Sequence, residues 1–269
     1  MSRRRILTLT ALATASVAVL TACSGGAATS DSSAPDDEYG LVTSGTLTVA
    51  TEGTYRPFTY HEDGSGDLVG YDVEIIEAVA DKLGLEVVFE ETQWDAIFAG
   101  LDAGRFDLIA NQVSINPERE EKYIFSEPYT VSPGVIVVKE DDDSISSFDD
   151  LDGKTTAQSL TSNWYQLALD NGAQVEAVEG WAQAVALLEQ GRVDATINDK
   201  LTFLDYETTD GPTGLKIAAE TDDPASSAFA FTKEKQALVD AVDEALDELR
   251  EEGVLAEISE KYFGADVTE

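Results

Sequence analysis

The chain has 269 residues, of which 53 are acidic and 17 are lysine or arginine, so its formal net charge is −36. This charge repels phosphate groups, which excludes most nucleic-acid-binding roles and argues against direct docking on anionic lipid. Hydrophobic residues make up 43% of the sequence, and the length allows one large domain or two modest ones. We therefore expect a folded protein with a well-solvated surface and no nucleic-acid partner.

Residues 1–22 are predicted to be a signal peptide and not part of the fold. Three arginines near the start precede an apolar run that is too short for a stable membrane span. The run ends in Leu20-Thr21-Ala22-Cys23, which resembles the lipobox of bacterial lipoproteins. This resemblance implies cleavage before Cys23 and lipid on its sulfur. We expect a lipid-anchored protein at the cell membrane, facing the extracellular or periplasmic side.

Cys23 is the only cysteine, so the folded part is predicted to contain no disulfide, no thiolate nucleophile and no cysteine metal site. Residues 23–44, the lipidated cysteine and the segment after it, are rich in small and polar residues and are predicted to form a flexible tether. The acidic run at 141–143 suits a bound cation or a solvated loop, and the loop is the favoured interpretation. We expect no metal and no cofactor.

From residue 45 onward, apolar runs of strand length alternate with segments of helical periodicity. Short apolar segments flank the turn-rich stretch 61–67, which predicts a hairpin. Gly84 and Gly104 are predicted to end two helices. The predicted strands are 47–50, 85–89, 108–110, 174–178 and 228–231, and the predicted helices are 71–83, 94–103, 164–171, 181–190, 199–206, 236–251 and 255–263.

A segment in the second half repeats one in the first half at a fixed offset. Leu101-x-x-Gly104-Arg105-Phe106-Asp107 matches Leu188-x-x-Gly191-Arg192-Val193-Asp194, and an apolar strand that ends in asparagine follows each copy. Each copy reads as a helix, a glycine cap and a buried strand. The repeat predicts two α/β lobes of similar build, each with a mainly parallel sheet. Two crossings, at 130–139 and 228–231, would return the C-terminal helices to the first lobe.

The strand of each copy ends in polar residues that suit a binding site. Asn111-Gln112 follows the first strand, and Asn198-Asp199 follows the second. Ligands of open α/β sheets bind beyond the carboxyl ends of the strands. Two facing lobes would therefore place both dipeptides in one cleft. Asp199 would supply negative charge there, although it also suits the N-cap of the next helix.

Arg119 lies in the first turn of a helix that Asn116-Pro117 is predicted to begin, with the asparagine as N-cap. A cation at a helix N-terminus opposes the helix dipole, which indicates that it faces an anion. An arginine can donate two parallel hydrogen bonds to a carboxylate. With Asp199 opposite it, Arg119 would suit the two charges of a zwitterion. The alternative is a surface arginine paired with a neighbouring glutamate.

The stretch from Asn111 through Arg119 to Phe125-Ser126-Glu127-Pro128-Tyr129 resembles the polar amino-acid-binding proteins of bacterial ABC importers, solute-binding family 3. The resemblance implies an α/β, two-lobed periplasmic-binding-protein-like fold of type II, with two crossings between the lobes. It also implies delivery of an amino acid to the transmembrane permease subunits of an ABC importer. We expect a monomer whose lobes comprise residues 45–132 with 229–269, and residues 133–228.

The resemblance assigns ligand contacts to matching positions of this chain. Residues at the end of the first strand, with Arg119, would hold the α-carboxylate, and Asp199 would hold the α-ammonium. Tyr55 would stack on the ligand and Trp94 would contact it, although core packing is the alternative for both. In the second lobe Leu160 stands where the family has glycine, so the local backbone can differ. The predicted ligand-binding residues are Glu52, Tyr55, Trp94, Asn111, Gln112, Ser114, Arg119, Thr161, Ser162 and Asp199.

Within the family, Thr51-Glu52-Gly53-Thr54-Tyr55, Gln93-Trp94-Asp95 and Asn111-Gln112-Val113-Ser114 look most like cystine-binding proteins. We expect L-cystine as the ligand, with glutamine, glutamate or histidine as alternatives. An enzyme is a weaker interpretation, because the only histidine, His61, lies in a turn and a Ser-His-Asp triad is not indicated. Cyclohexadienyl dehydratases are similar to this family and use cleft carboxylates, so Glu52 keeps that alternative open. A sensor role would require a partner protein.

Overall fold

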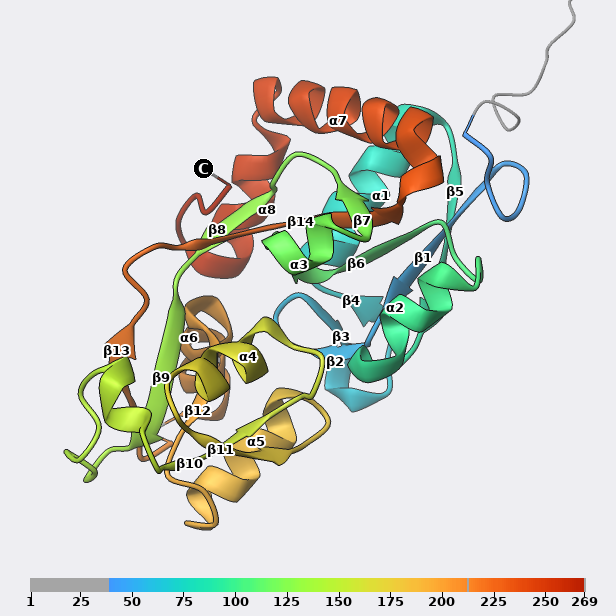
Figure 1. Cartoon of the computed structure of the whole chain (residues 1–269). Coiled ribbons are helices and arrows are strands. Elements are labelled where there is room, and N and C mark those ends of the chain that lie inside the picture. The colour runs from blue at the N-terminus through green and yellow to red at the C-terminus, as the bar shows by residue number, and fades with distance from the viewer. Residues whose placement is uncertain (1–38, 212, 269) are drawn as a thin grey trace, which may run out of the picture. The chain divides into compact units, whose positions relative to one another are not determined.

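The computed structural model describes residues 39–211 and 213–268 (Figure 1). The predicted signal peptide, Cys23 and most of the predicted tether lie outside these described residues. In the described part of the chain, no helix has the length and apolar character needed to cross a membrane. The described residues form a two-lobed α/β fold, as the sequence predicts.

The first lobe is built on a six-stranded sheet in the order β5-β1-β6-β14-β7, with β8 also paired to β14. β1 runs parallel to β5 and β6, whereas β14 runs antiparallel to β6, β7 and β8. The sheet is therefore mixed and not mainly parallel, because β14 brings the chain back from the second lobe. Its strands are β1 (Thr46–Thr51), β5 (Glu86–Glu91), β6 (Leu108–Ser114), β7 (Tyr123–Phe125), β8 (Thr130–Ser132) and β14 (Ala225–Thr232).

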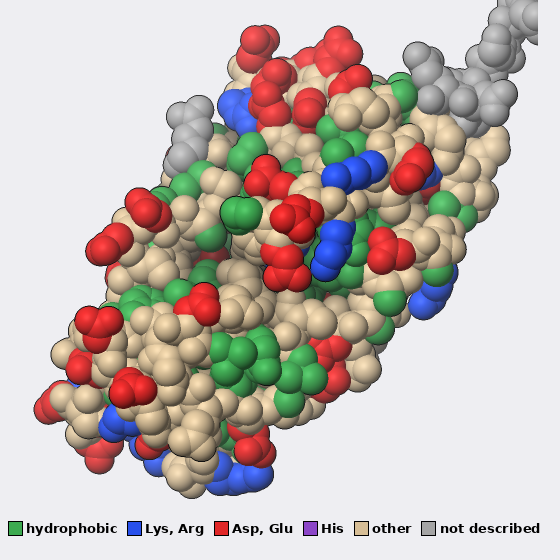
Figure 2. Space-filling model, in the orientation of Figure 1, with side chains coloured by type: hydrophobic (Ala, Val, Ile, Leu, Met, Phe, Trp, Pro, Cys, Tyr) green, Lys and Arg blue, Asp and Glu red, His purple; other side chains and the backbone are tan. Residues whose placement is uncertain are grey.

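Helices cover both faces of this sheet. α1, α7 and α8 share one apolar core with β1 and β14, and α2 packs on the opposite side with β6. α7 is amphipathic, and its solvent side carries the acidic side chains that gather at the top of Figure 2. Gly84 ends α1 with a φ of 69°, as predicted. The helices are α1 (Tyr71–Leu83), α2 (Trp94–Asp102), α3 (Pro117–Glu120), α7 (Gln236–Glu251) and α8 (Val254–Phe263).

The second lobe contains a three-stranded sheet, β12-β9-β13, and a parallel pair, β10-β11. β9 is antiparallel to both of its neighbours, so the predicted mainly parallel sheet is wrong here too. The reason is that β9 brings the chain into the lobe while β13 leads it out. The elements are β9 (Gly134–Lys139), β10 (Thr155–Gln158), β11 (Gln174–Ala177), β12 (Thr196–Asp199), β13 (Leu215–Glu220), α4 (Asn163–Asp170), α5 (Gly180–Glu189) and α6 (Lys200–Asp210).

Two segments connect the lobes, as predicted (Figure 1), but the second crosses between β13 and β14, before the predicted residues 228–231, which pair within the first-lobe sheet. β8 continues into β9, and β13 leads into β14. The segments lie side by side, because Ser132 of β8 pairs with Ala225 of β14. The exact boundaries of the lobes stay a prediction.

The remaining regular structure consists of short elements. The predicted hairpin at the turn 61–67 is confirmed, and it belongs to a small antiparallel sheet, β2-β3-β4. Its strands lead from β1 to α1, and β2 contains Tyr55. These elements are β2 (Thr54–Tyr55), β3 (Thr59–His61), β4 (Leu68–Val69) and the 3₁₀ helices Glu62–Gly64, Phe148–Leu151 and Lys233–Lys235.

Candidate functional site

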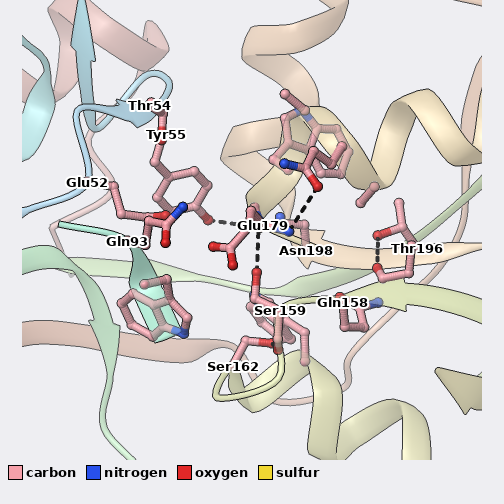
Figure 3. Close-up of a pocket in the computed structure, with 18 of the residues that line it drawn as sticks. Glu52, Thr54, Tyr55, Gln93, Gln158, Ser159, Ser162, Glu179, Thr196 and Asn198 are labelled. Atoms are coloured by element: carbon pink, nitrogen blue, oxygen red, sulfur yellow. Dashed lines mark hydrogen bonds between the residues drawn. The ribbon is translucent and has the colours of Figure 1, made fainter. Parts of the chain in front are cut away.

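A cavity of about 370 Å³ lies between the lobes, lined by residues of both (Figure 3). The first lobe contributes the loop after β1, the start of α2 and the middle of β6. The second lobe contributes the end of β10, the starts of α4 and α5, and β12. Six of the predicted ligand-binding residues line this cavity: Glu52, Tyr55, Trp94, Asn111, Gln112 and Ser162.

Asn111 fixes the position of Glu52 at one wall. Its Oδ1 accepts hydrogen bonds from the Glu52 backbone N–H at 2.9 Å and the Thr51 hydroxyl at 3.1 Å. Its Nδ2 donates to Glu52 Oε2 at 2.7 Å. Burial raises the pKa of Glu52 to about 7, and the nearby Glu179 carboxylate adds to the rise. Both carboxylates line the cavity (Figure 3), so this wall is suited to a cation.

Tyr55 joins the two lobes. Its hydroxyl donates to Asn198 Oδ1 at 2.8 Å and accepts from the Thr202 hydroxyl at 3.1 Å. Its ring lies 5.0 Å from the ring of Phe58, and the side chain also lines the cavity. Core packing and ligand contact are therefore compatible for Tyr55, because its ring packs near Phe58 and its side chain also borders the cavity.

Unpartnered polar atoms converge on the cavity. Three buried N–H groups there have no hydrogen-bond acceptor among the described residues, and one buried carbonyl oxygen there has no donor. Roughly nine in ten buried polar groups in proteins have a hydrogen-bond partner, so this cluster of unpaired groups is suited to the polar groups of a ligand. The donors are Trp94 Nε1, Trp181 Nε1 and Gln158 Nε2, and the acceptor is Gln112 Oε1.

Sequence reasoning missed Trp181, Gln158, Ser159 and Glu179, which also line the cavity. The offset that relates Leu101 to Leu188 also relates Trp94 to Trp181, so extending the repeat by about two turns of helix toward the N-terminus would have found Trp181. Both tryptophans lie in the first turns of matching helices, α2 and α5. No comparable pattern marks Gln158 or Ser159.

Arg119 is buried, with 8% of its surface exposed, so the alternative of a surface arginine paired with a neighbouring glutamate is wrong. Its guanidinium donates to the Ser114 carbonyl at 2.8 Å and approaches the Thr161 carbonyl at 3.5 Å. No carboxylate of the described residues forms an ion pair with it, and burial lowers its pKa to about 10. A buried cation without a counter-ion is costly, which favours an anionic ligand there.

Arg119 does not line the first cavity. It lines a second one of about 710 Å³, together with Thr161, and Ser162 and Asn163 border both cavities. Asn116 caps α3 by accepting from the Arg119 backbone N–H at 2.9 Å, as predicted. The two cavities therefore meet at the start of α4.

The second-lobe hydroxyls make internal bonds. Thr161 donates from its backbone N–H and its hydroxyl to Asp95 Oδ1, at 3.0 and 2.8 Å, which connects the lobes. Ser162 is the N-cap of α4, and its Oγ accepts from the Tyr165 backbone N–H at 3.1 Å. Ser114 is buried and contributes its carbonyl to Arg119, but it lines neither cavity.

Asp199 caps α6, as the alternative interpretation predicts. Its Oδ1 accepts from the Leu201 backbone N–H at 2.8 Å and from the Ser132 hydroxyl at 2.7 Å. Burial raises its pKa to about 6. The neighbouring Asn198 lines the first cavity, whereas Asp199 lies behind this wall. Its partner Ser132 lies on the first crossing, so this carboxylate contacts both the second lobe and the crossing.

Two α/β lobes, two crossings and a polar cavity between the lobes define a two-lobed solute-binding protein of the type II periplasmic-binding-protein fold. The chain belongs to the bacterial extracellular solute-binding proteins, family 3, because the sequence model of this family matches residues 47–265.

Three similar proteins illustrate this membership. The L-cystine-binding protein TcyA of Bacillus subtilis is 51% identical over 94% of this chain and 95% of its own length. A probable amino-acid ABC transporter-binding protein of Haemophilus influenzae is 54% identical over 83% of this chain and 87% of its own. The unliganded, open L-cystine solute receptor of Neisseria gonorrhoeae is 47% identical, with a TM-score of 0.57, over 83% of this chain and 95% of the receptor.

We predict that Glu52→Gln flattens the pH dependence of stability. Because the pKa of Glu52 rises from 4.5 to about 7 on folding, its stabilising effect is complete below about pH 4.5 and is lost as the pH rises through about 7. Urea unfolding at about pH 5 and about pH 7.5 should show a smaller loss of unfolding free energy in the variant than in the wild type. Glu86→Gln, at an exposed position of β5, is the control. Equal losses in wild type and Glu52→Gln would contradict the assignment.

Proposed function

We propose that this chain is the extracellular substrate-binding lipoprotein of an amino-acid ABC importer, that it captures L-cystine between its lobes, and that it delivers it to a permease. One observation carries the proposal: unpaired buried N–H donors, an unpaired acceptor and two carboxylates border one cavity. Donors suit carboxylates of a ligand, and the acceptor and carboxylates suit its ammonium groups. Such a mixture matches a zwitterion.

Cystine matches this set of donors, acceptor and carboxylates with both of its ends. It carries two amino-acid heads, each with an ammonium and a carboxylate, joined by a disulfide. We assign one head to Arg119 and Asp199, and the other to the wall that Glu52 and Glu179 form. Trp94 and Trp181 would contact the sulfurs, since sulfur packs favourably on aromatic rings. The similarity to proteins named for L-cystine binding supports this choice.

The assignment of Arg119 rests on its unpaired charge. Its buried guanidinium donates hydrogen bonds only to carbonyl oxygens and lies over the rings of Trp94 and Phe98, so a ligand carboxylate would supply the missing anion. Asp199 has one carboxylate oxygen, Oδ2, without a hydrogen bond to the described residues. We assign this oxygen to an ammonium group of the ligand. Thr161 and Ser162 would then act from the second lobe.

A binder of glutamine, glutamate or histidine is the second candidate. The Arg119 and Asp199 assignments hold for any amino acid, and only the far wall distinguishes among them. Two carboxylates at that wall favour a far end with positive charge, which glutamine and glutamate lack. Catalysis is the weakest candidate, because the similar proteins are named as binding proteins and a receptor. We propose that the chain is not an enzyme and acts as a monomer.

A thermal-shift panel of the natural amino acids and cystine, without reductant, tests the ligand. Cystine at 100 times its dissociation constant should stabilise the protein by ~2.7 kcal/mol. Arginine, lysine and histidine belong in the panel because they also carry a cation at the far end. A larger shift with any other amino acid would overturn cystine and retain amino-acid binding, whereas no shift with any of them would overturn the proposed function.

Arg119→Ala should weaken ligand binding at least tenfold. Truncating one partner of a buried charge pair costs roughly 2–5 kcal/mol, and each 1.4 kcal/mol is about a factor of ten. Arg105→Ala, at an exposed arginine of the same lobe, should leave the affinity unchanged. Calorimetry on folded variants gives the comparison. An Arg119→Ala variant that binds as tightly as the wild type would remove Arg119 from the site.

Membrane anchoring through Cys23 is part of the proposal, supported by its lipobox-like context. The wild-type protein made in a bacterial host is expected to carry acyl mass on an N-terminal Cys23 and to fractionate with membranes. Cys23→Ala should be released to the soluble fraction or left unprocessed. Mass spectrometry that finds the wild-type N-terminus without an acyl group would contradict this.

A further inference from the structure

Gln112 combines an unusual backbone with an unused side-chain oxygen. Its φ is +50°, in the left-handed region that residues with a side chain rarely adopt. The register of β6 against β14 shifts at this place, between Ile109 opposite Ala230 and Val113 opposite Ala228. Bulges of this kind re-aim a side chain and are common beside functional sites. The side chain re-aimed here lines the cavity.

Asp72 holds Gln112 at two points. Asp72 Oδ2 accepts from the Gln112 backbone N–H at 2.7 Å, and Oδ1 accepts from Gln112 Nε2 at 2.7 Å. The Tyr129 hydroxyl donates to Oδ2 at 2.8 Å. Asp72 is fully buried in the first turn of α1, and none of the described residues forms an ion pair with it. Neutral donors alone therefore hold this carboxylate in place, and the carboxylate in turn fixes the bulge.

The same bonds determine which way the Gln112 amide faces. The amide nitrogen has two hydrogens. One goes to Asp72 Oδ1, and the Thr130 hydroxyl, 3.0 Å from Nε2, takes the other. Turning the amide over would place Oε1 against the Asp72 carboxylate, two acceptors without a hydrogen between them, which is costly in a buried site. Oε1 is left buried at the cavity, without a donor among the described residues.

We infer that Gln112 Oε1 accepts a hydrogen bond from an ammonium group of the bound amino acid, and that Asp72 is the positioning residue that keeps Gln112 an acceptor. The surroundings of Gln112 also favour a cationic group, because Glu52 lines the same cavity and Asp199 lies behind the opposite wall. The repeat relates Gln112 to Asp199, so each lobe contributes an ammonium acceptor directly after its asparagine. The inference rests on the proposed amino-acid binding and changes one assignment, since the resemblance placed Gln112 with the carboxylate contacts.

Isosteric variants and calorimetry with L-cystine, without reductant, test the inference. Gln112→Met keeps the side-chain length and removes the amide, and it should weaken cystine binding about tenfold. Asp72→Asn offers a donor where Gln112 needs an acceptor, and it should weaken binding to a similar degree. The double variant should bind no more weakly than Gln112→Met alone, because Asp72 acts through Gln112.

Tyr129→Phe is the matched control. It removes a hydrogen bond to Oδ2 of the same Asp72 carboxylate and leaves the Gln112 side-chain amide with both of its acceptors, Asp72 Oδ1 and the Thr130 hydroxyl, so it should lower the melting temperature and leave the cystine affinity within about twofold of the wild type. Equal loss of affinity in Tyr129→Phe would mean that Asp72 acts only through stability, which would overturn its positioning role. If Asp72→Asn does not fold, Gln112→Met against Tyr129→Phe still decides whether the amide contributes to affinity.

A crystal structure of the cystine complex tests the acceptor role directly. A ligand nitrogen is expected within hydrogen-bond distance of the Gln112 amide, and a carboxylate oxygen there would overturn the inference. A wild type that binds cystine while Asp72→Asn and Gln112→Met bind equally well would overturn the inference and retain the proposed function. A wild type that binds no amino acid would overturn both.

Discussion

The site depends on buried ionisable side chains that have no oppositely charged side chain beside them. Asp72, Asp199 and Arg119 are buried, and Glu52 is withdrawn from water, yet none of them forms an ion pair with the described residues. Each is held by neutral groups: an asparagine amide, a glutamine amide, hydroxyls, backbone N–H groups or carbonyls. Neutral partners fix the position of a charge and leave its electrostatic field available to a ligand.

The contrast with Asp107 shows that this arrangement is specific to the cavity region. Asp107 is also fully buried, but Lys235 lies 2.8 Å from its Oδ1, and the Val42 and Thr48 backbone N–H groups complete its hydrogen bonds. That carboxylate ties the N-terminal strand to the start of α7 and has no contact with the cavity. Unpaired charge destabilises a fold, so proteins retain it mainly where function requires it.

The two lobes meet through polar bonds that could be exchanged for bonds to a ligand. Tyr55 reaches Asn198, and Thr161 reaches Asp95, in each case from one lobe to the other. The crossings that connect the lobes also carry partners of the site, since Thr130 contacts Gln112 and Ser132 contacts Asp199. Single hydrogen bonds therefore join the crossings to Gln112, which lines the cavity, and to Asp199, so closure of the lobes on a ligand would act on these bonds.

The sequence by itself determined the elements and the repeat. Helical periodicity and glycine caps predicted α1 from Tyr71 to Leu83, because both are local properties of the chain. The strand ends of the repeat and the family resemblance also pointed to six residues that line one cavity in the structure. The sequence did not predict the direction of the strands. β14 and β9 are antiparallel to their neighbours because of the way the chain enters and leaves the second lobe, which no local pattern encodes.

Only the tertiary structure decided what each site residue can offer a ligand. Gln112 reads as a donor or an acceptor in the sequence, and it became an acceptor because Asp72, distant along the chain, takes one of its hydrogens and Thr130 takes the other. The sequence allows Arg119 to pair with a neighbouring glutamate, but in the structure its guanidinium is buried and forms no ion pair with the described residues. Hydrogen-bond capacity is a property of an amino acid, but what remains of it for a ligand depends on every group that packs against it.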